Sequence, residues 1–488
     1  MPVKVLMLGW EFPPFITGGL GTACYGLTKA MERAGMDITF VLPKAVPPAE
    51  TSHVQLMSPG TEMGEPVHNF TPPTRNQRFA DIINSSGQWK SNVIIKELRE
   101  RFSRTEFIDL PFYAESNYGP HSGIHRTTLE SIAEKRLLTL IDAGAFDNVS
   151  DPEVQRELAE LIGEEPEHEQ VENKPTTAVD YGGDLIGQAN AYARYCVDVA
   201  RRVEFDVIHA HDWLTYPAGL AVARLSGRPL VVQVHSTEFD RSGEHVNQPV
   251  YNIERRGMQS AVRVITVSEL TKRVCVNRYG ISPEKIDVVY NGVDFEPTDV
   301  KPIETKDKIV LFFGRITMQK GPEFFVQAAK RVLEVMDNVK FVVAGSGDLA
   351  AMMIEMAAEM GIGHKVLFTG FLRGRDISRV FALADLYVMP SVSEPFGIAP
   401  LEAMSHDVPV LISKSSGVSE VLSHALKVDF WDVDEIANKI VAVLRHPPLR
   451  KALRDNGRFE IRSLTWDGAA KRCGDVYEKM IKDFAVLQ

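Results

Sequence analysis

Short, continuously apolar runs, each followed by a helical or loop stretch, recur along this chain and restart once after a break. The runs before the break are 3–8, 38–42, 206–210, 229–234, 263–267 and 285–289; those after it are 309–313, 340–344, 366–369, 386–389 and 408–412. Runs of this kind are typical of parallel strands that are covered by helices on both faces, because such strands have no solvated side. We therefore predict an α/β fold of two doubly wound, Rossmann-like domains in tandem with a cleft between them.

The break at 292–308 is rich in Pro, Asp, Glu and Lys, and we interpret it as a linker. An N-terminal domain is accordingly predicted at 1–294 and a C-terminal domain at 308–465. The stretch 45–182 is polar and lacks the strand–helix rhythm, so we interpret it as an insertion in the N-terminal domain. The last stretch, 466–488, is predicted to form a helix that returns to the N-terminal domain.

Composition excludes several classes of function. The net charge of −11 argues against a nucleic-acid-binding or anionic-membrane-binding protein, because both need a basic face. The four cysteines lie far apart without metal-ligand spacing, as expected for reduced thiols. No apolar run reaches membrane-spanning length, and the N-terminal run is interpreted as a strand rather than a signal peptide. We expect a cytoplasmic protein with no membrane insertion and leave its oligomeric state open.

The segment SEPFGIAPLEAM carries two glutamates, Glu394 and Glu402, around Gly397 and Pro400. It follows an apolar run and is interpreted as a strand end, a tight turn and a helix start. Backbone N–H groups and the helix dipole at such a turn favour a phosphate. Two carboxylates would be out of place in a loop that binds only an anion, but they can accept hydrogen bonds from sugar hydroxyls. The segment therefore indicates a nucleotide-sugar site.

A second glycine-rich segment, FGRITMQKG, delivers Arg315 and Lys320 between a strand end and a helix. Arg can bind two phosphate oxygens at once and Lys adds a point charge, so the pair could neutralise a diphosphate leaving group. The alternative is a cationic loop that is simply solvated. The later piece Gly345-Ser-Gly347 lacks the third glycine and the acidic residue of a dinucleotide fingerprint, which is weak evidence against a dehydrogenase.

In the N-terminal domain, three segments follow predicted strands and should meet at one sheet edge. Gly18 and Gly19 allow a backbone to approach phosphate closely; His211 and Asp212 could bind or orient sugar hydroxyls; His235 could donate a hydrogen bond beside the reacting carbon. A zinc site at His209, His211 and Asp212 is an alternative, but no further ligand set is evident. We therefore predict no metal site.

Taken together, these segments resemble the GT-B retaining glycosyltransferases of family 4 and the bacterial glycogen and starch synthases. The matching pieces are WEFPPFITGGLG, DVIHAHDW, VVQVHSTE, ITVSELT, VVYNGVD, FFGRITMQKG, GFL and SEPFGIAPLEAM. They cover residues 3–42 and about 182–485. Their order and spacing make the resemblance specific, although each piece alone is only moderately so.

The resemblance implies a role for each matching residue. Arg315 and Lys320 would bind the donor diphosphate, and Glu394 would contact the transferred sugar. His235 would lie beside the anomeric carbon with Asp212 nearby. The other implied donor contacts are the sugar or distal phosphate at Gly397 and Ile398, the ribose at Glu402, and the nucleobase near Phe371 and Leu372. The reaction would retain the anomeric configuration without a protein nucleophile, a divalent metal or a cofactor, since the nucleotide sugar is a substrate.

Two departures from glycogen synthases concern specificity. No lysine precedes Gly18-Gly19 at the N-terminal glycine loop, and Phe396 stands where a cysteine is frequent. We expect a hexosyltransferase that moves glucose from ADP- or UDP-glucose to a growing α-1,4-glucan. The alternatives are a family 4 enzyme that acts on a small sugar, a sugar phosphate or another polysaccharide, and a silent carbohydrate-binding relative. The nucleobase and the acceptor stay open.

Overall fold

The computed structural model describes residues 2–13, 18–44, 53–61, 63, 185–294 and 306–486, with side chains to Lys482. All of these residues belong to one compact unit. Most of the predicted insertion and the central part of the predicted linker lie outside the described residues. Within the described part of the chain, no helix is long and apolar enough to cross a membrane.

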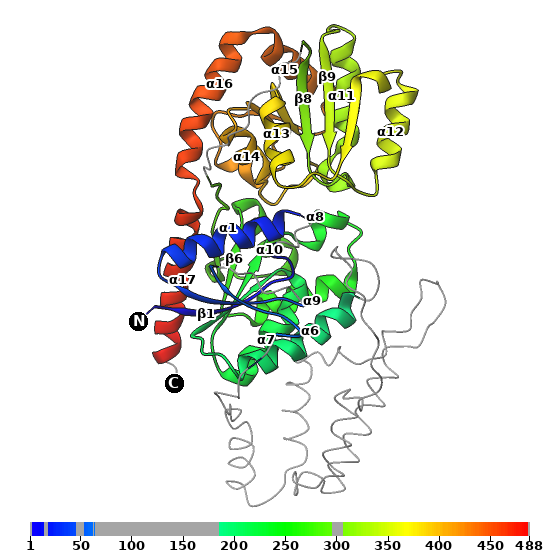
Figure 1. Ribbon diagram of the computed structural model, residues 1–488. Helices are drawn as coiled ribbons and strands as arrows, with labels where there is room; N and C mark the ends of the chain where they lie inside the picture. The colour runs from blue at the N-terminus through cyan, green and yellow to red at the C-terminus, as the bar shows by residue number, and fades with distance from the viewer. Residues whose placement is uncertain are drawn as a thin grey trace, which may run out of the picture. The chain divides into compact units, whose positions relative to one another are not determined.

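The first sheet has seven parallel strands among the described residues, in the order β3-β2-β1-β4-β5-β6-β7. Its strands β1 and β6 are labelled in Figure 1. These strands are β1 (Lys4–Leu8), β2 (Asp37–Val41), β3 (Gln55–Met57), β4 (Val207–His211), β5 (Leu230–Val234), β6 (Arg263–Thr266) and β7 (Ile286–Val288). At the centre, Val5 of β1 pairs with Ile38 on one side and with Val207 on the other. The strand order reverses its direction of growth between β1 and β4, where doubly wound sheets bind ligands.

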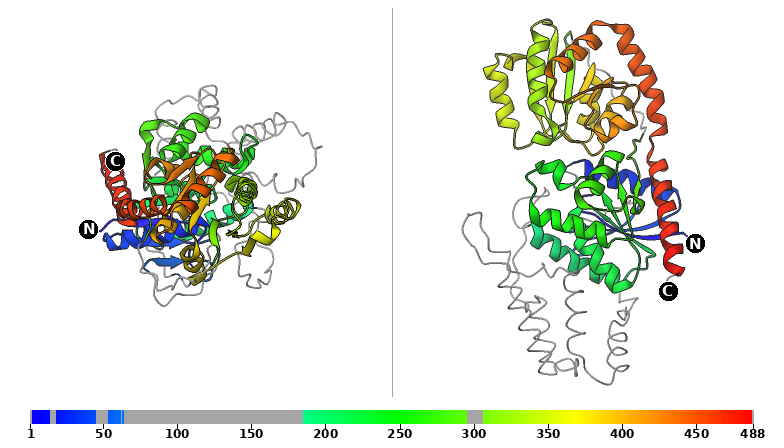
Figure 2. Two further views of the ribbon diagram at one scale, coloured as in Figure 1. Left: turned by 90° about the horizontal axis from the view of Figure 1, so that it is seen from above. Right: turned by 180° about the vertical axis from the view of Figure 1, so that it is seen from behind.

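Helices cover both faces of this sheet. They are α1 (Gly19–Arg33), α6 (Leu185–Ala200), α7 (Tyr216–Ser226), α8 (Glu238–Ser242), α9 (Gln248–Ser260), α10 (Glu269–Tyr279) and the final helix α17 (Trp466–Val486). Apolar residues of α6, α7 and α9 form the core on one face. Residues of α1 and α17 form the core on the other face, so the chain end returns to the first sheet as predicted (Figure 2).

The second sheet has six parallel strands in the described range, ordered β10-β9-β8-β11-β12-β13. They are β8 (Lys308–Phe313), β9 (Val339–Ala344), β10 (Val366–Gly370), β11 (Leu386–Met389), β12 (Val410–Ser413) and β13 (Leu426–Val428). Its helices are α11 (Pro322–Leu333), α12 (Ala350–Glu359), α13 (Arg375–Leu383), α14 (Ala399–Ser405), α15 (Val433–Arg445) and α16 (Pro447–Glu460). Helices α11, α12 and α15 pack on one face, and α13 and α14 on the other.

Single 3₁₀ turns complete several connections: η2 (Trp213–Thr215), η3 (Pro283–Lys285), η4 (Met318–Lys320), η5 (Gly363–Lys365), η6 (Gly417–Glu420) and η7 (Ile461–Ser463). The starts of the longer helices follow from local sequence. Ser268 caps α10 by accepting a hydrogen bond from Thr271 N at 3.0 Å, and Pro322 occupies the first position of α11. Gly280 ends α10 in the left-handed conformation (φ 67°).

Each of the eleven apolar runs corresponds to a strand, with boundaries shifted by at most two residues. Two strands of three residues were missed, β3 and β13, because so short a run carries too little periodicity to be recognised. Strand β3 lies inside the stretch 45–182. The first sheet therefore gains a strand from residues that we had interpreted as insertion.

The contact between α1 and α17 depends on Gly26, where any side chain would collide with Trp466. Trp466, at the start of α17, is 3% exposed and lies against Gly26 of α1. A Cβ atom added to Gly26 would lie 2.3 Å from Cε2 and Nε1 of the indole. The indole is enclosed by the core on this face of the first sheet, so it has little room to move.

We predict that Gly26→Ala lowers the free energy of unfolding by about 1 to 3 kcal/mol, the usual cost of overpacking a core. Gly468→Ala is the matched control, because Gly468 is exposed on α17 and its added Cβ would come no closer than 3.8 Å to Thr465 Oγ1. That control should be neutral or slightly stabilising, since alanine favours a helix over glycine. Urea unfolding of both variants measures the difference; equal midpoints would contradict the packing argument.

Candidate active site

Lys320 and Glu394 form an ion pair between two loops at the carboxyl edge of the second sheet. Lys320 ends the turn η4 after β8, and Glu394 follows β11. The Glu394 carboxylate is 8% exposed and also accepts a hydrogen bond from Ser391 Oγ at 3.4 Å. The Glu394 main chain bonds to Ser415 O at 3.0 Å and Gly417 N at 2.9 Å. The backbone thus fixes the carboxylate, and the carboxylate fixes the ammonium group.

Two glycines allow these loops to come so close. Gly321 has φ 62°, and a Cβ added there would lie 2.2 Å from Pro390 O. Gly397 has φ 101°, and its Cβ would lie 3.2 Å from Glu394 Cγ. Any other residue would be strained in both conformations, and at Gly321 its Cβ atom would also push the two loops apart. The sequence predicted the turn at Gly397 correctly, and α14 begins two residues later.

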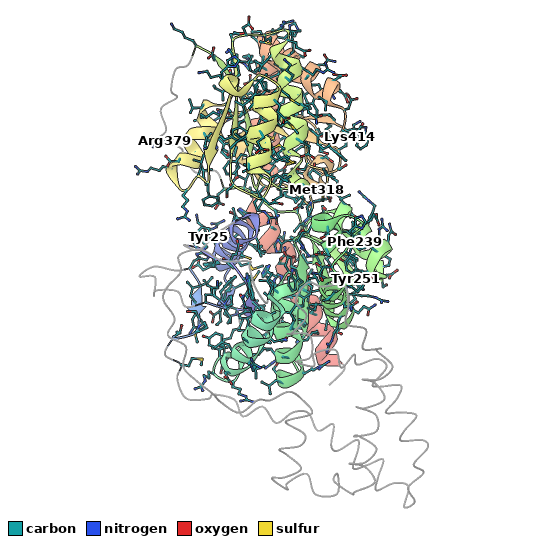
Figure 3. The ribbon with its side chains drawn as sticks, turned by 90° about the vertical axis from the view of Figure 1, so that its right-hand side faces the viewer. Tyr25, Phe239, Tyr251, Met318, Arg379 and Lys414 are labelled. Atoms are coloured by element: carbon teal, nitrogen blue, oxygen red, sulfur yellow. The ribbon has the colours of Figure 1, made fainter. Side chains whose placement is uncertain are left out.

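Arg315 lies on the same βα loop as Lys320 but points outward. Its side chain is exposed and makes no hydrogen bond or ion pair with the residues described here. A guanidinium group that is not already paired can bind an anion without first losing a partner. Met318, in the turn between Arg315 and Lys320, is also about half exposed (Figure 3).

The loops after β8, β9 and β10 are joined backbone to backbone. A Cβ on Gly345 would lie 1.8 Å from Gly314 O, and one on Gly347 would lie 2.2 Å from Ile316 O. Gly345 N also donates to Gly370 O at 3.0 Å. Gly345 and Gly347 therefore serve to bring loops into contact, which explains two glycines without a dinucleotide fingerprint.

Phe371 and Leu372 follow β10 at the outer end of this row of loops. The Phe371 ring is 47% exposed, and the Arg373 guanidinium lies 5.3 Å from the ring centroid. One aromatic face is thus engaged by a cation while much of the ring stays accessible. An exposed ring at this edge can stack on a planar group such as a nucleobase.

Glu402 differs from Glu394 in its surroundings. It lies in the first turn of α14, is partly buried and forms no ion pair with a cation among the described residues. Burial raises the pKa of Glu402 to about 7. The carboxyl group is therefore partly protonated at neutral pH and can both donate and accept hydrogen bonds, as a pair of ribose hydroxyls would require.

Three histidines gather at the switch point of the first sheet. Strand β4 reaches His211, one residue beyond the predicted run, so His209 and His211 lie within the strand and not in the loop after it. Their rings stack at 4.3 Å, as alternation along a strand predicts. His211 Nδ1 lies 2.9 Å from His235 Nε2, and His209 Nδ1 lies 2.5 Å from Tyr477 Oη. Burial lowers the pKa of His209 and His235 to about 3, so both rings are neutral at pH 7.

Asp212 holds the loop that carries His235. Its Oδ1 accepts hydrogen bonds from the backbone N–H groups of His235 at 2.7 Å and Ser236 at 3.3 Å. The residue has φ 58°, an unfavourable conformation for a non-glycine residue that only the surrounding contacts can maintain. Burial raises the pKa of Asp212 to about 7. One of its two oxygens is thus occupied by the backbone, and contact with a sugar hydroxyl stays a prediction for the other.

The described side chains come nearest to a metal-ligand set at Cys24, His211 and His235, whose potential ligand atoms lie within 4.8 Å of one another. This set differs from the zinc alternative considered from the sequence, because it contains neither His209 nor Asp212. The 2.9 Å contact between His211 and His235 is a hydrogen bond, and burial raises the pKa of the Cys24 thiol well above its usual value. A metal ion at this position would have to displace the hydrogen bond between the two rings, and the absence of a metal site stays a prediction.

Hydrogen bonds connect the SEPFG loop to the loops of the first sheet. Ser393 Oγ donates to Asp240 Oδ1 at 2.6 Å, and Ser268 Oγ donates to Pro395 O at 2.5 Å. Ile398 packs against the core formed by α1 and α17. Helix α8, which directly follows the His235 loop, also contacts the turn η4 that carries Lys320. The SEPFG loop and the turn η4 thus adjoin helix α8 and Ser268 of the first sheet.

Asp240 was missed by the sequence analysis, although a signal was present. Thr237 and Asp240 form a capping box at the start of α8, a pattern that can be recognised as a Thr followed three residues later by an acid. Arg241, next in sequence, pairs with Glu238 and Glu254. This buried network, with Phe239 and Tyr251 packed edge to face beside it (Figure 3), fixes α8 on the first sheet.

Three sequence families match successive parts of the chain. Residues 4–115 match the starch synthase catalytic domain, 161–297 match Glycosyltransferase Family 4, and 295–459 match Glycosyl transferases group 1. The last match contains Arg315, Lys320, Glu394 and Glu402.

Two relatives illustrate the range of the matching sequences. An uncharacterized glycosyltransferase of Methanocaldococcus jannaschii is 32% identical over 296 residues, which cover 56% of this chain and 75% of the relative. A D-inositol 3-phosphate glycosyltransferase of Catenulispora acidiphila is 29% identical over 306 residues, which cover 57% of this chain and 73% of the relative.

Solved structures share the fold at low sequence identity. Sucrose-phosphate synthase from Thermosynechococcus elongatus superposes with a TM-score of 0.65 at 16% identity, covering 99% of this chain and all of that one. Anabaena HepE in complex with UDP and glucose has a TM-score of 0.59 at 16% identity, covering 97% and 99% of the two chains. With the relative that is 32% identical, the three family matches and two Rossmann-like sheets, the chain belongs to the GT-B glycosyltransferases of family 4.

Proposed function

We propose that this enzyme is a retaining glucosyltransferase that moves glucose from ADP- or UDP-glucose to a growing α-1,4-glucan. The observation that carries the proposal is the Lys320–Glu394 pair beside the unpaired Arg315, at the carboxyl edge of a doubly wound sheet. This arrangement offers two cations to a diphosphate and a fixed carboxylate to sugar hydroxyls. The match of residues 4–115 to the starch synthase catalytic domain supports a glucan as acceptor.

The proposed role of Lys320 and Arg315 is to stabilise the leaving nucleoside diphosphate. Charge develops on the diphosphate oxygen as its bond to the anomeric carbon breaks. Lys320 is 22% exposed, so its ammonium group can contact this oxygen without leaving Glu394. Preorganised cations of this kind lower the barrier because they need no reorganisation during the reaction. The proposal uses no protein nucleophile, metal or cofactor.

His235 is proposed to lie beside the reacting carbon and donate a hydrogen bond to the transferred sugar. Its Nε2 is engaged by His211, which leaves Nδ1 for a ligand. A neutral imidazole suits this role, because a positive ring would repel the positive charge that develops at the anomeric carbon. Asp212 contributes by holding the His235 backbone in place. In this arrangement the fully buried His211 acts through His235.

We propose that the first sheet supplies the acceptor side, about 1–294, and the second sheet the donor side, about 308–465. The cytoplasm is proposed as the compartment because the four cysteines are all free and buried.

A small phosphorylated acceptor is the second candidate, and the likeness to a D-inositol 3-phosphate glycosyltransferase favours it. A silent carbohydrate-binding relative is less favoured, because the ion pair, the cationic loop and the His235 loop have no joint structural purpose.

The proposal is tested by nucleotide release from UDP-, ADP- and GDP-glucose with and without glycogen. Glycogen-dependent release from one donor is expected, and it should vanish in Glu394→Gln, which keeps the shape of the side chain but loses its charge. Release that ignores glycogen would move the acceptor to small sugars, for which inositol phosphate is the first to try. No release from any donor would overturn the enzymatic proposal.

Replacement of Lys320 by methionine should reduce kcat about 100-fold or more, because one charge-stabilising group is lost from the transition state. Lys451→Met is the matched control, because Lys451 is 72% exposed on α16 and its ion pair among the described residues is with the neighbouring Asp455. That variant should keep wild-type kcat. A Lys320 variant that lost donor affinity but kept kcat would show that the ammonium group binds the ground state and transition state equally.

Glu402→Gln should stabilise the protein above pH 7 while weakening donor binding. The pKa of Glu402 is raised from 4.5 to about 7, so the folded state holds its proton more tightly than the unfolded state does. Its contribution to stability is full below about pH 4.5 and is lost as the pH rises to 7. At pH 8 we expect the substitution to raise the free energy of unfolding by about 1 to 2 kcal/mol, a range that already allows for the partial exposure of the group. At pH 4.5 we expect no gain.

Thermal unfolding of wild type and Glu402→Gln at the two pH values measures this. Equal stability at pH 8 would show that the carboxyl group is well solvated. Glu355→Gln, an exposed position on α12, is the control and should change neither stability nor donor affinity.

A further inference from the structure

A hollow of about 490 Å³ lies between α11, α12 and the start of α15, on the helical face of the second sheet. Its lining contains none of the residues assigned above to donor or acceptor binding. The first feature that points to a ligand is Trp431, which lines the hollow and is 61% exposed. A tryptophan so exposed is unusual for a side chain with this much apolar area.

The indole of Trp431 packs against a second aromatic ring, Phe430, which is itself packed on helix α11. Phe430 contacts it edge to face, with ring centroids 4.8 Å apart and an interplanar angle of 85°. Phe430 in turn packs on Phe324 of α11, with centroids 5.3 Å apart. Asp432 caps α15 through Glu435 N at 2.9 Å, which fixes the backbone next to the tryptophan. Trp431 is therefore a supported platform and not a loose surface side chain.

The polar lining of the hollow is balanced in charge. Lys330 and Arg331 contribute two positive charges, and Asp432 and Asp434 contribute two negative charges. Arg331 Nε and Asp434 Oδ1 form an ion pair at 3.3 Å across the lining. A site for a nucleotide or another anion would carry an excess of positive charge. A balanced set, completed by Gln327, instead offers donors and acceptors to a neutral ligand with many hydroxyl groups.

We propose that this hollow, which we call the Trp431 site, binds a segment of the α-glucan acceptor at a distance from the reacting end. The flat apolar face of a glucose ring would stack on the indole, and its hydroxyls would bond to the charged and amide groups around it. The site would retain the enzyme on a branched or long glucan between transfers. This inference rests on the proposed function, because it takes the acceptor to be an α-glucan.

The test separates polysaccharide binding from catalysis. Wild type, Trp431→Ala and Phe459→Ala are run in native gels that contain glycogen, amylopectin, dextran or no polysaccharide. Phe459 is the matched control, since it is an aromatic residue that is 75% exposed on α16 and lies outside the hollow. Initial rates are measured in parallel with glycogen and with maltotriose as acceptors.

Glycogen and amylopectin should retard wild type and Phe459→Ala much more strongly than Trp431→Ala, and dextran should retard none of them. Truncation of a central aromatic contact typically weakens binding about tenfold or more, so the KM for glycogen should rise by that factor. The KM for the nucleotide sugar and kcat with maltotriose should stay at wild-type values, which a misfolded variant would not show.

Equal retardation of wild type and Trp431→Ala would overturn the Trp431 site, as would wild-type mobility that no polysaccharide alters. Retardation by dextran that depends on Trp431 would also overturn it, because the ligand would then not be an α-1,4-glucan. If Trp431 is needed for gel retardation but glycogen does not stimulate nucleotide release, the proposed function fails and the Trp431 site stands as a glucan-binding site. The two proposals therefore fail separately.

Discussion

The ion pair between Lys320 and Glu394 is the interaction on which the rest of the site depends. A carboxylate that is almost fully buried must have a partner, and here one cation and a hydroxyl supply it. The pair joins the loop after β8 to the loop after β11, across the centre of the second sheet. Two hydrogen bonds then extend this arrangement to the first sheet: Ser393 donates to Asp240, and Pro395 O accepts from Ser268. One electrostatic contact thus sets the geometry of loops that arise from both halves of the chain.

Much of this architecture was predictable from the sequence, because strands buried on both faces leave an unmistakable apolar run. The same logic placed chemistry-bearing residues at strand ends, and the structure does bring Arg315, Lys320 and Glu394 to one edge. What the sequence could not show is which partner each group takes. Glu394 and Glu402 look alike in one segment, yet one is paired with lysine and the other has a raised pKa. Their difference arises from tertiary contacts with residues far away in the chain.

The histidines also show that the sequence does not reveal the partner of each polar group. His211 and His235 were recognised as separate candidates, but the hydrogen bond between them makes them one unit. Asp212 was expected to contact a sugar, whereas its hydrogen bonds in the structure hold the backbone of the His235 loop. Asp240 lies in a helix-capping pattern and Trp431 in a pair of adjacent aromatic residues. Neither pattern indicates a function until the neighbouring residues in the structure are known. Local pattern thus predicts where polar groups gather, and packing decides what each of them does.

The backbone contact between Gly314 and Gly345 has a consequence for how this enzyme can diversify. Because carbonyl oxygens occupy the space that a Cβ atom would need, Gly345 and Gly347 tolerate almost no substitution. Phe371 and Arg373 lie one strand further out, exposed and held only by side-chain contact. Mutations can therefore accumulate at the outer edge without moving the inner loops. With the predicted nucleobase contact at Phe371, a scaffold divided in this way could change the nucleotide that it accepts without moving the inner loops, so the segment after β10 is where we would first change donor preference.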